Sequence, residues 1–133
     1  MAKPTSAWVS AGAKWGRVLE QTQAVGLAPL LGSSPDVGAV GYTLGGGMGW
    51  LARKYGLSTD SVNRFELITA DGQMVNASAT ENADLFWGLR GGGGNFGVVT
   101  SFEFALHPMS RQVIGGSRDF VPVIACGVLR TGA

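Results

Sequence analysis

The sequence predicts an α+β domain in which a mixed or antiparallel sheet is flanked by helices. Short strand-like segments alternate with segments of helical periodicity. Asp71-Gly72 lies between two apolar segments and is a strong β-hairpin signal, which indicates at least one antiparallel strand pair. Hydrophobic residues make up 45% of the chain and charged residues 14%, values that favour a folded chain over a disordered one.

The chain begins with a predicted strand and a predicted helix. Alternation over residues 7–11 predicts a short strand. Apolar residues at helical spacing over 14–25 predict a helix, with Val25 on its apolar face and Gly26 at its C-terminal cap. A second short strand is expected over 27–31.

Turns dominate the next part of the chain. Residues 32–38 form a turn-rich loop, and residues 40–44 lead from it into a run of glycines. Residues 50–55 can form only a helix of one or two turns, because Gly56 ends it. The two strands of the predicted hairpin are expected at 65–70 and 73–77.

One further helix and one long strand complete the predicted fold. Asn82 is expected to cap a helix over 83–90. Residues 98–106 predict the clearest strand, which ends at His107-Pro108. One face of this strand is predicted to carry Thr100, Phe102, Phe104 and Leu106, and the other Ser101 and Glu103. Beyond about Ser110 the pattern predicts no element, so we divide the chain into a domain over 1–110 and an unassigned tail over 111–133.

Composition excludes several classes of function. The net charge of +1 gives no electrostatic reason to bind nucleic acid. No apolar run reaches the roughly 18 residues of a membrane span, and the N-terminus has no apolar signal-peptide core, so we expect a cytoplasmic rather than a secreted protein. Cys126 is the only cysteine and His107 the only histidine, so no cluster of the kind that holds a metal is expected.

Glycine is the compositional outlier, with 22 residues concentrated in two clusters at 45–49 and 91–97. Consecutive glycines let backbone N–H groups approach a ligand closely, although they can also serve only to form tight turns. Both clusters lie among aromatic and apolar residues, which flexible linkers lack. We therefore favour a ligand-binding role for both clusters.

Two common nucleotide-binding motifs fit the clusters poorly. Residues 47–52 match the Ala-ended form of the dinucleotide fingerprint, and Glu66 lies near the expected ribose-binding position, but Gly56 cuts the following helix short. Residues 92–97 also match that fingerprint, but they follow a helix and precede a strand, which is the reverse of the required order. A P-loop is excluded because no Gly-Lys-Ser/Thr follows either cluster. A Rossmann domain is thus a disfavoured alternative.

Three segments together resemble the berberine-bridge-enzyme-like oxidases of the vanillyl-alcohol-oxidase/p-cresol-methylhydroxylase (PCMH) FAD superfamily. These segments are 41–57, 68–72 and 82–100, and the resemblance extends from about Ala7 to Pro108 without gaps. It implies a PCMH-type FAD-binding domain of two α+β subdomains with the flavin between them, of which this chain is similar to the second subdomain only.

The resemblance also implies a cofactor site built largely from backbone groups. The loop before the first glycine cluster would lie along the isoalloxazine and ribityl side of FAD, and the segment after the second cluster would touch its adenine-nucleotide side. The implied flavin-contacting residues are Ser34, Asp36, Val37, Gly38, Gly41, Tyr42, Gly45, Gly46, Gly97, Val98 and Val99. Among them, Tyr42 is the best candidate for facing a reacting flavin, with plain packing as its alternative role.

Two departures from the family pattern limit what the chain is expected to do. Family members with doubly attached flavin carry a cysteine where this chain has Ser34, and a hydroxyl cannot form that thioether. The family's Arg/Gly/Gly/His segment, which cradles the pyrophosphate, is not found in the chain. Nor do we assign any residue as a catalytic base, since Asp36, Asp60, Glu66, Asp71 and Glu103 fit turn, cap or surface roles.

The resemblance therefore implies the FAD-binding portion of a flavin-dependent oxidoreductase. The family oxidises an alcohol or amine carbon by hydride transfer to flavin N5. A small-molecule substrate is expected only if further segments complete the site. The alternative is a non-catalytic flavin-binding or scaffold module. An incomplete domain is also expected to expose apolar surface and to self-associate.

Overall fold

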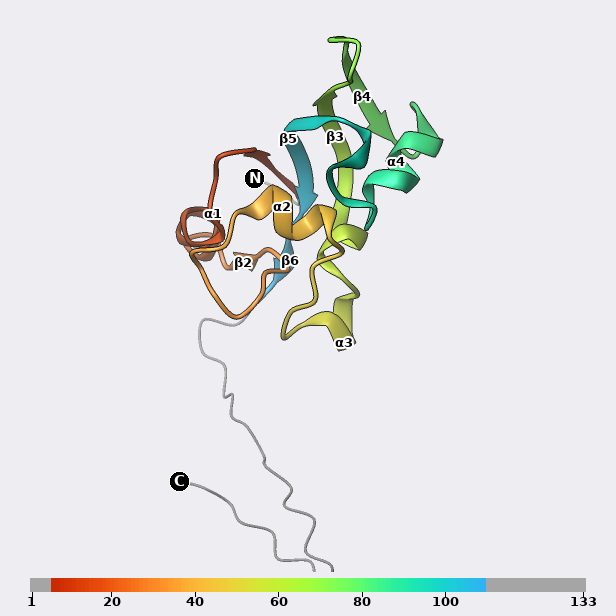
Figure 1. Ribbon diagram of the computed structural model, residues 1–133. Coiled ribbons are helices and arrows are strands. Elements are labelled where there is room, and N and C mark those ends of the chain that lie inside the picture. The colour runs from red at the N-terminus through yellow and green to blue at the C-terminus, as the bar shows by residue number, and fades with distance from the viewer. Residues whose placement is uncertain (1–5, 110–133) are drawn as a thin grey trace, which may run out of the picture.

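A four-stranded antiparallel sheet forms the centre of the fold, seen in a computed structural model that describes residues 6–109 (Figure 1). Its strand order is β1-β5-β3-β4, with every neighbouring pair antiparallel. The bounds of these strands are β1 Ser6–Ser10, β3 Val62–Ile68, β4 Met74–Ser78 and β5 Val98–Ala105. A second, two-stranded sheet pairs β2 (Leu27–Ala28) with β6 (His107–Pro108).

Four α-helices and two short 3₁₀-helices accompany the sheet in this part of the chain. They are α1 Trp15–Gln23, α2 Ala39–Leu44, α3 Ala52–Tyr55, η1 Ser58–Ser61, α4 Ala83–Leu89 and η2 Gly93–Phe96. Helices α1, α2 and α4 contribute buried residues to the same core as the sheet, whereas α3 buries none. The predicted α+β class is confirmed. Within residues 6–109, no helix combines the length and apolar character needed to cross a bilayer.

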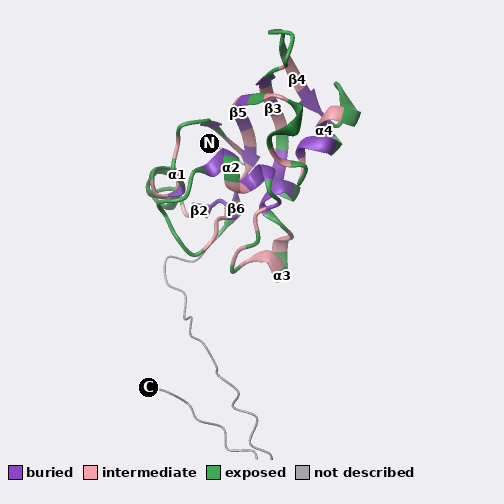
Figure 2. Cartoon of the chain, viewed as in Figure 1, coloured by how far each residue is buried: buried purple, intermediate pink, exposed green. Residues whose placement is uncertain are grey.

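Buried residues of the sheet and of α1, α2 and α4 form one core, and aromatic rings lie at its centre (Figure 2 colours the buried residues). Trp15 is fully buried and meets Phe102 and Phe104 edge-on, with ring centroids 6.5 and 5.4 Å apart. Phe65 on β3 stacks on Phe102 at 6.1 Å. Burial of each such ring stabilises the fold by about 1.5–3 kcal/mol. Phe102 and Phe104 point inward while Ser101 and Glu103 are half-buried on the other face, as predicted for this part of β5. The predicted inward place of Thr100 was wrong, because a register shift against β3 leaves Thr100 half-buried and buries Val99 instead.

The predicted hairpin forms, but with a three-residue loop in place of two residues. Thr69 N–H donates to the Gln73 carbonyl at 2.9 Å, and Gly72 N–H donates to the Thr69 carbonyl at 2.9 Å. Ala70, Asp71 and Gly72 form the loop, and Gly72 adopts φ +79°. Positive φ at the last residue of such a loop is a conformation for which glycine is favoured.

Several element ends differ from the prediction because tertiary contacts set them. Helix α1 ends at Gln23, and Val25 lies beyond it with 42% of its surface exposed, so its predicted place on the apolar face was wrong. Asn82 precedes α4 as predicted, but its side-chain amide donates to the Asn76 carbonyl at 2.6 Å and caps nothing. His107-Pro108 does not end the sheet structure but begins the pairing with β2.

The two 3₁₀-helices were not predicted, since neither has an apolar period. In η1, Ser58, Thr59 and Ser61 are buried polar residues in a segment whose composition resembles a surface turn. The unassigned tail over 111–133, including Cys126, lies outside the described residues.

Candidate functional site

The helix that leads into the first glycine cluster contacts the second cluster, although the two clusters are separated by more than 40 residues in the sequence. Helix α2 precedes the first cluster and packs against η2, which lies within the second (Figure 1). The inner side of α2 buries Val40, Thr43 and Leu44 in the core.

The outward face of α2 is bare backbone. Gly38, Gly41 and Gly45 are exposed, and their spacing of three and four residues places them on one side of the helix. A Cβ added at Gly38 or Gly41 would meet nothing within 4 Å, and neither residue has a positive φ. Gly38 is the N-cap of α2, where glycine is accepted. At Gly41 the fold gives no reason for glycine, although a mid-helix glycine costs about 1 kcal/mol relative to alanine. Close approach of a ligand to the backbone is the physical reason that remains.

The second cluster contains one glycine that the fold requires and another that it does not. A Cβ at Gly97, where φ is +145°, would lie 2.5 Å from the Ile68 carbonyl oxygen, so the fold requires glycine there. At Gly94, by contrast, φ is −83° and a Cβ would meet nothing within 4 Å. Gly94 is thus as open as Gly38 and Gly41, and η2, which contains it, packs against α2; we call these three residues the glycine face.

The loop before α2 is attached to the start of α1 by backbone hydrogen bonds. Gly16 N–H donates to the Pro35 carbonyl at 2.8 Å, and Trp15 N–H donates to the Val37 carbonyl at 3.0 Å. Asp36 forms an exposed ion pair with Lys14 at 3.5 Å, and Ser34 Oγ accepts a long hydrogen bond of 3.4 Å from Asp36 N–H. The predicted site residues of this loop thus sit in an exposed segment that leads directly into the glycine face.

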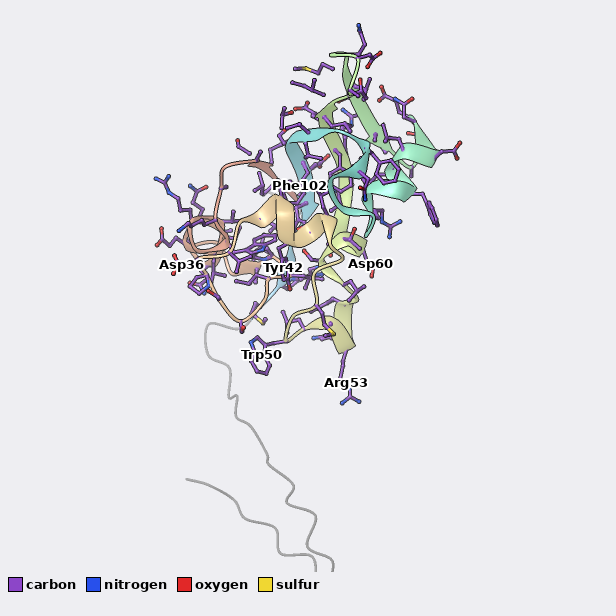
Figure 3. The ribbon with its side chains drawn as sticks, viewed as in Figure 1. Asp36, Tyr42, Trp50, Arg53, Asp60 and Phe102 are labelled. Atoms are coloured by element: carbon purple, nitrogen blue, oxygen red, sulfur yellow. The ribbon has the colours of Figure 1, made fainter. Side chains whose placement is uncertain are left out.

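Tyr42 packs inward from the edge of the glycine face (Figure 3). Its ring meets Trp15 edge-on with centroids 6.0 Å apart. A Cβ at Gly32 would lie 3.1 Å from the Tyr42 ring, so the surrounding loop closes tightly around it. The Tyr42 Oη is buried without a hydrogen-bond partner among the described residues, and this burial raises the pKa of the phenol. The geometry therefore favours the packing role for Tyr42.

The remaining predicted site residues differ in what they can offer a ligand. Val98 exposes 69% of its surface, whereas the Val99 side chain is buried in the core, so Val99 can offer only backbone atoms. Gly45 caps α2 and is exposed, while Gly46 is buried with φ +98°. The adjacency of α2 with both β5 and η2 brings the segments that carry these residues to one side of the fold.

The histidine and the carboxylates considered as acids, bases or metal ligands have hydrogen-bond or stacking partners within the fold. His107 Nε2 lies 2.9 Å from Ser61 Oγ, and the His107 ring packs on Tyr55 with centroids 4.2 Å apart. Burial lowers the pKa of His107. Glu66 accepts from Ser101 at 2.5 Å and Glu103 from Ser6 at 2.7 Å. Among residues 6–109, no group of His, Cys, Asp and Glu side chains has a metal-binding arrangement.

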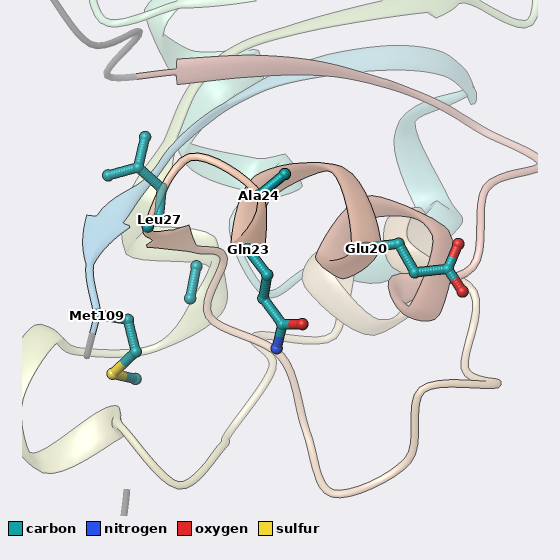
Figure 4. A pocket seen from close by; sticks show the side chains of 7 residues that line it. Glu20, Gln23, Ala24, Leu27 and Met109 are labelled. Atoms are coloured by element: carbon teal, nitrogen blue, oxygen red, sulfur yellow. The ribbon is translucent and has the colours of Figure 1, made fainter. Parts of the chain in front are cut away.

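A groove of about 400 Å³ lies on another part of the surface, below the end of α1 (Figure 4). Glu20, Gln23, Leu27 and Met109 line it, and none of the predicted flavin-contacting residues does. It contains no cluster of convergent polar groups comparable with the exposed backbone of the glycine face. We therefore place the candidate site on the glycine face.

Comparison with known proteins identifies the family. A family profile described as an FAD binding domain matches residues 3–78, more than half of the chain. The chain belongs to this family. The FAD that the resemblance implied is thus the family's cofactor, and an FAD-binding domain of the predicted PCMH type is confirmed.

Individual relatives agree with this assignment. The chain is 37% identical to (R)-6-hydroxynicotine oxidase of Paenarthrobacter nicotinovorans over 117 residues, which is 88% of this chain and 26% of the relative. A glucooligosaccharide oxidase from Acremonium strictum has a TM-score of 0.74 and 40% identity, covering 77% of this chain and 22% of that one. For a BBE-like protein of Physcomitrella patens the TM-score is 0.75 and the identity 38%, covering 78% and 23%. The chain spans about a quarter of these relatives' length or less.

The exposed backbone fits the flavin and ribityl parts of FAD better than it fits a phosphate. None of the predicted flavin-contacting residues is a lysine or arginine, so the pyrophosphate charge meets no cation among them. Backbone N–H and C=O groups without a Cβ between them suit the flat, polar edges of a flavin and its ribityl chain. The residues present thus fit one side of an FAD molecule.

Proposed function

We propose that this chain provides one wall of the FAD site of a flavin-dependent oxidoreductase. The observation that carries the proposal is the glycine face, where the fold leaves backbone exposed without any internal need for glycine. Bound FAD would supply the redox chemistry by accepting a hydride from an alcohol or amine carbon. The chain's own residues would bind and orient the cofactor.

Individual residues have distinct parts in this proposal. The loop that contains Ser34, Asp36 and Val37, together with the outward side of α2, would lie along the isoalloxazine and ribityl side. The backbone of Gly97, Val98 and Val99 would lie toward the adenine nucleotide, while the Val98 side chain shares the other sheet face with Trp8 and Met74. The hydrogen bonds from α1 to the loop support this arrangement, because they hold the loop in place before any cofactor arrives.

Ser34 bears on how the flavin would be attached. The glucooligosaccharide oxidase of Acremonium strictum contains a 6-S-cysteinyl, 8α-N1-histidyl FAD. A serine hydroxyl has no sulfur with which to form the cysteinyl bond, and Ser34 Oγ accepts a backbone hydrogen bond. We therefore propose that no bond joins Ser34 to the flavin. Peptide mapping by mass spectrometry after acid precipitation tests this, and a flavin adduct on the Ser34 peptide would refute it.

The substrate of a complete enzyme would be a small alcohol or amine. The relatives are named as oxidases of hydroxynicotine and of glucooligosaccharide, which represent these two classes. The second candidate function is a flavin-binding module without turnover. The observation behind it is that Asp36, the acid in the loop before α2, is paired with Lys14 at 3.5 Å.

An FAD titration of the purified full chain tests the proposal. We expect weak binding, with a Kd in the millimolar range or about −4 kcal/mol, because only one wall of the site is present. Amide chemical shifts of an isotope-labelled sample report such binding and should move at 34–46 and 91–99. Absence of any shift at these positions would refute the proposed function. A stoichiometric, tightly held yellow flavin would contradict the one-wall description.

Oxidation assays with an alcohol and an amine, with oxygen as acceptor, separate the two candidate functions. Turnover by an assembled protein that contains this chain would support the oxidoreductase. Flavin binding without turnover of either class would support the binding module.

A further inference from the structure

A charged pair links the supports of the two glycine clusters. Arg90 Nη2 donates to Asp60 Oδ1 at 2.9 Å, and Arg90 Nε donates to the Thr59 carbonyl at 3.2 Å. The other carboxylate oxygen of Asp60 accepts from Leu57 N–H at 2.9 Å. Each oxygen of Asp60 therefore has its own partner, and Arg90 binds two consecutive residues of η1.

Helix η1 holds the first glycine cluster. Ser58 N–H donates to the Gly47 carbonyl at 2.8 Å, and Thr59 N–H donates to the Gly46 carbonyl at 3.0 Å. Ser58 Oγ also lies 3.1 Å from Thr43 Oγ1, a buried contact with the inner side of α2. Any displacement of η1 would therefore move both the first cluster and α2.

Helix α4 holds the second glycine cluster. Gly92 N–H donates to the Gly88 carbonyl at 3.0 Å, and the Phe96 ring folds back over Gly88 and Gly92, where no Cβ could be accommodated. Arg90 follows the last residue of α4, and its guanidinium lies 5.4 Å from the centre of the Phe86 ring. The second cluster thus forms a unit with α4, and Arg90 is the residue through which this unit reaches η1.

We propose that Arg90 and Asp60 are positioning residues that set the spacing of the two glycine clusters for FAD. This inference rests on the proposed function, because it assumes that both clusters contact one cofactor. Neither side chain belongs to the glycine face, so their effect on FAD acts through the backbone that they hold. FAD bridges two segments only when their separation is correct, so loss of the pair lowers affinity without removal of any contact group.

The exposure of the Arg90–Asp60 ion pair distinguishes a positioning role from a general contribution to the stability of the fold. The Arg90 and Asp60 side chains are 32% and 46% exposed, and ion pairs exposed to this extent contribute little to the free energy of unfolding. Arg64 and Glu81 form a similar half-exposed pair at 4.0 Å, which joins β3 to the segment that follows β4 rather than joining the supports of the clusters. Arg64 therefore offers a matched control.

The experiment compares Arg90→Met, Asp60→Asn and their double variant with Arg64→Met and the unchanged chain, all as the full chain. Amide hydrogen exchange is measured without FAD, and amide-shift titration then gives the FAD dissociation constant. We expect Arg90→Met to speed exchange at Ser58 and Thr59 and to weaken FAD binding about fivefold or more. The double variant should be no weaker than the worse single variant, because the two residues act as one unit. Arg64→Met should change neither measurement.

Each result bears on a separate claim. Unchanged exchange at Ser58 and Thr59 in both folded single variants would overturn the positioning role, whether or not FAD binds. Unchanged FAD affinity beside faster exchange would also overturn it. If the unchanged chain shows no FAD-induced shifts, the proposed function fails while the exchange data still test the link between the clusters. Should Arg90→Met fail to fold, Asp60→Asn carries the test, because the amide oxygen of the introduced side chain can still accept from Leu57 N–H.

Discussion

Replacement of Gly41 by alanine is predicted to stabilise the chain and to weaken FAD binding at the same time. Gly41 lies within α2, and a Cβ there would meet nothing within 4 Å. Alanine in place of a mid-helix glycine adds about 0.5–1 kcal/mol to the free energy of unfolding. For a folded part of about 100 residues, this raises Tm by about 2–5 °C.

The same methyl group projects from the glycine face toward the proposed cofactor. We expect at least a tenfold loss of FAD affinity, or about 1.4 kcal/mol, because the flavin can no longer reach the backbone. Thermal unfolding by circular dichroism and amide-shift titration give the two numbers on the same sample. Gly12→Ala is the matched control, since Gly12 is equally open and lies outside the glycine face.

The opposite signs make this prediction easy to refute. A Gly41→Ala variant that binds FAD as tightly as the unchanged chain would show that no ligand approaches α2. A variant with lower Tm would show that Gly41 serves the fold. Equal losses of FAD affinity in Gly41→Ala and Gly12→Ala would show that the effect is not specific to this surface.

Three further predictions concern the surroundings of the site. Tyr42→Phe removes a buried hydroxyl that has no partner among the described residues. The free energy of unfolding should therefore stay the same or rise by up to about 1 kcal/mol, seen as an unchanged or higher Tm. A clear fall in Tm would refute the packing role. Burial lowers the pKa of His107, so the unfolded chain takes up its proton first as pH falls through about 6.5. Stability should therefore fall between about pH 7 and pH 5 more in the unchanged chain than in His107→Gln, and parallel Tm profiles would contradict this. The sheet face opposite the helices exposes Trp8, Met74 and Val98, so sedimentation should show self-association that rises with concentration, whereas a monomer at every concentration would argue against it.

Local sequence patterns predicted those elements whose ends are set by residues close in the sequence. The alternation around Phe102 and Phe104 specified β5 and its inward face, and Gly72 marked the hairpin loop. The pairing of β2 with β6 could not be predicted in this way, because it joins residues about 80 positions apart with two pairs only. Buried η1 was missed for a related reason, since Ser58 and Thr59 are polar and become buried only through hydrogen bonds to the first glycine cluster.

For the site as well, the sequence predicted what local patterns determine and missed what tertiary packing determines. The sequence indicated that the glycine clusters matter, and the fold packs α2, which leads into the first cluster, against η2 in the second. It could not separate the glycine that the backbone requires, such as Gly97 with its positive φ, from those that the fold does not require, such as Gly41 and Gly94. That distinction depends on what lies near each absent Cβ, which only the packed structure contains. The role of Arg90 was likewise invisible, because its partners Thr59 and Asp60 are about 30 residues away.

The central claim is that FAD lies against the backbone of Gly38, Gly41 and Gly94. Intermolecular nuclear Overhauser effects between FAD protons and the amide and α protons of the full chain test it most directly. We predict effects at Gly41 and Gly94 in the same complex, with none at the groove lined by Gln23 and Met109. Effects at that groove, or on the sheet face around Trp8 and Met74, with none at the glycine face, would contradict the account.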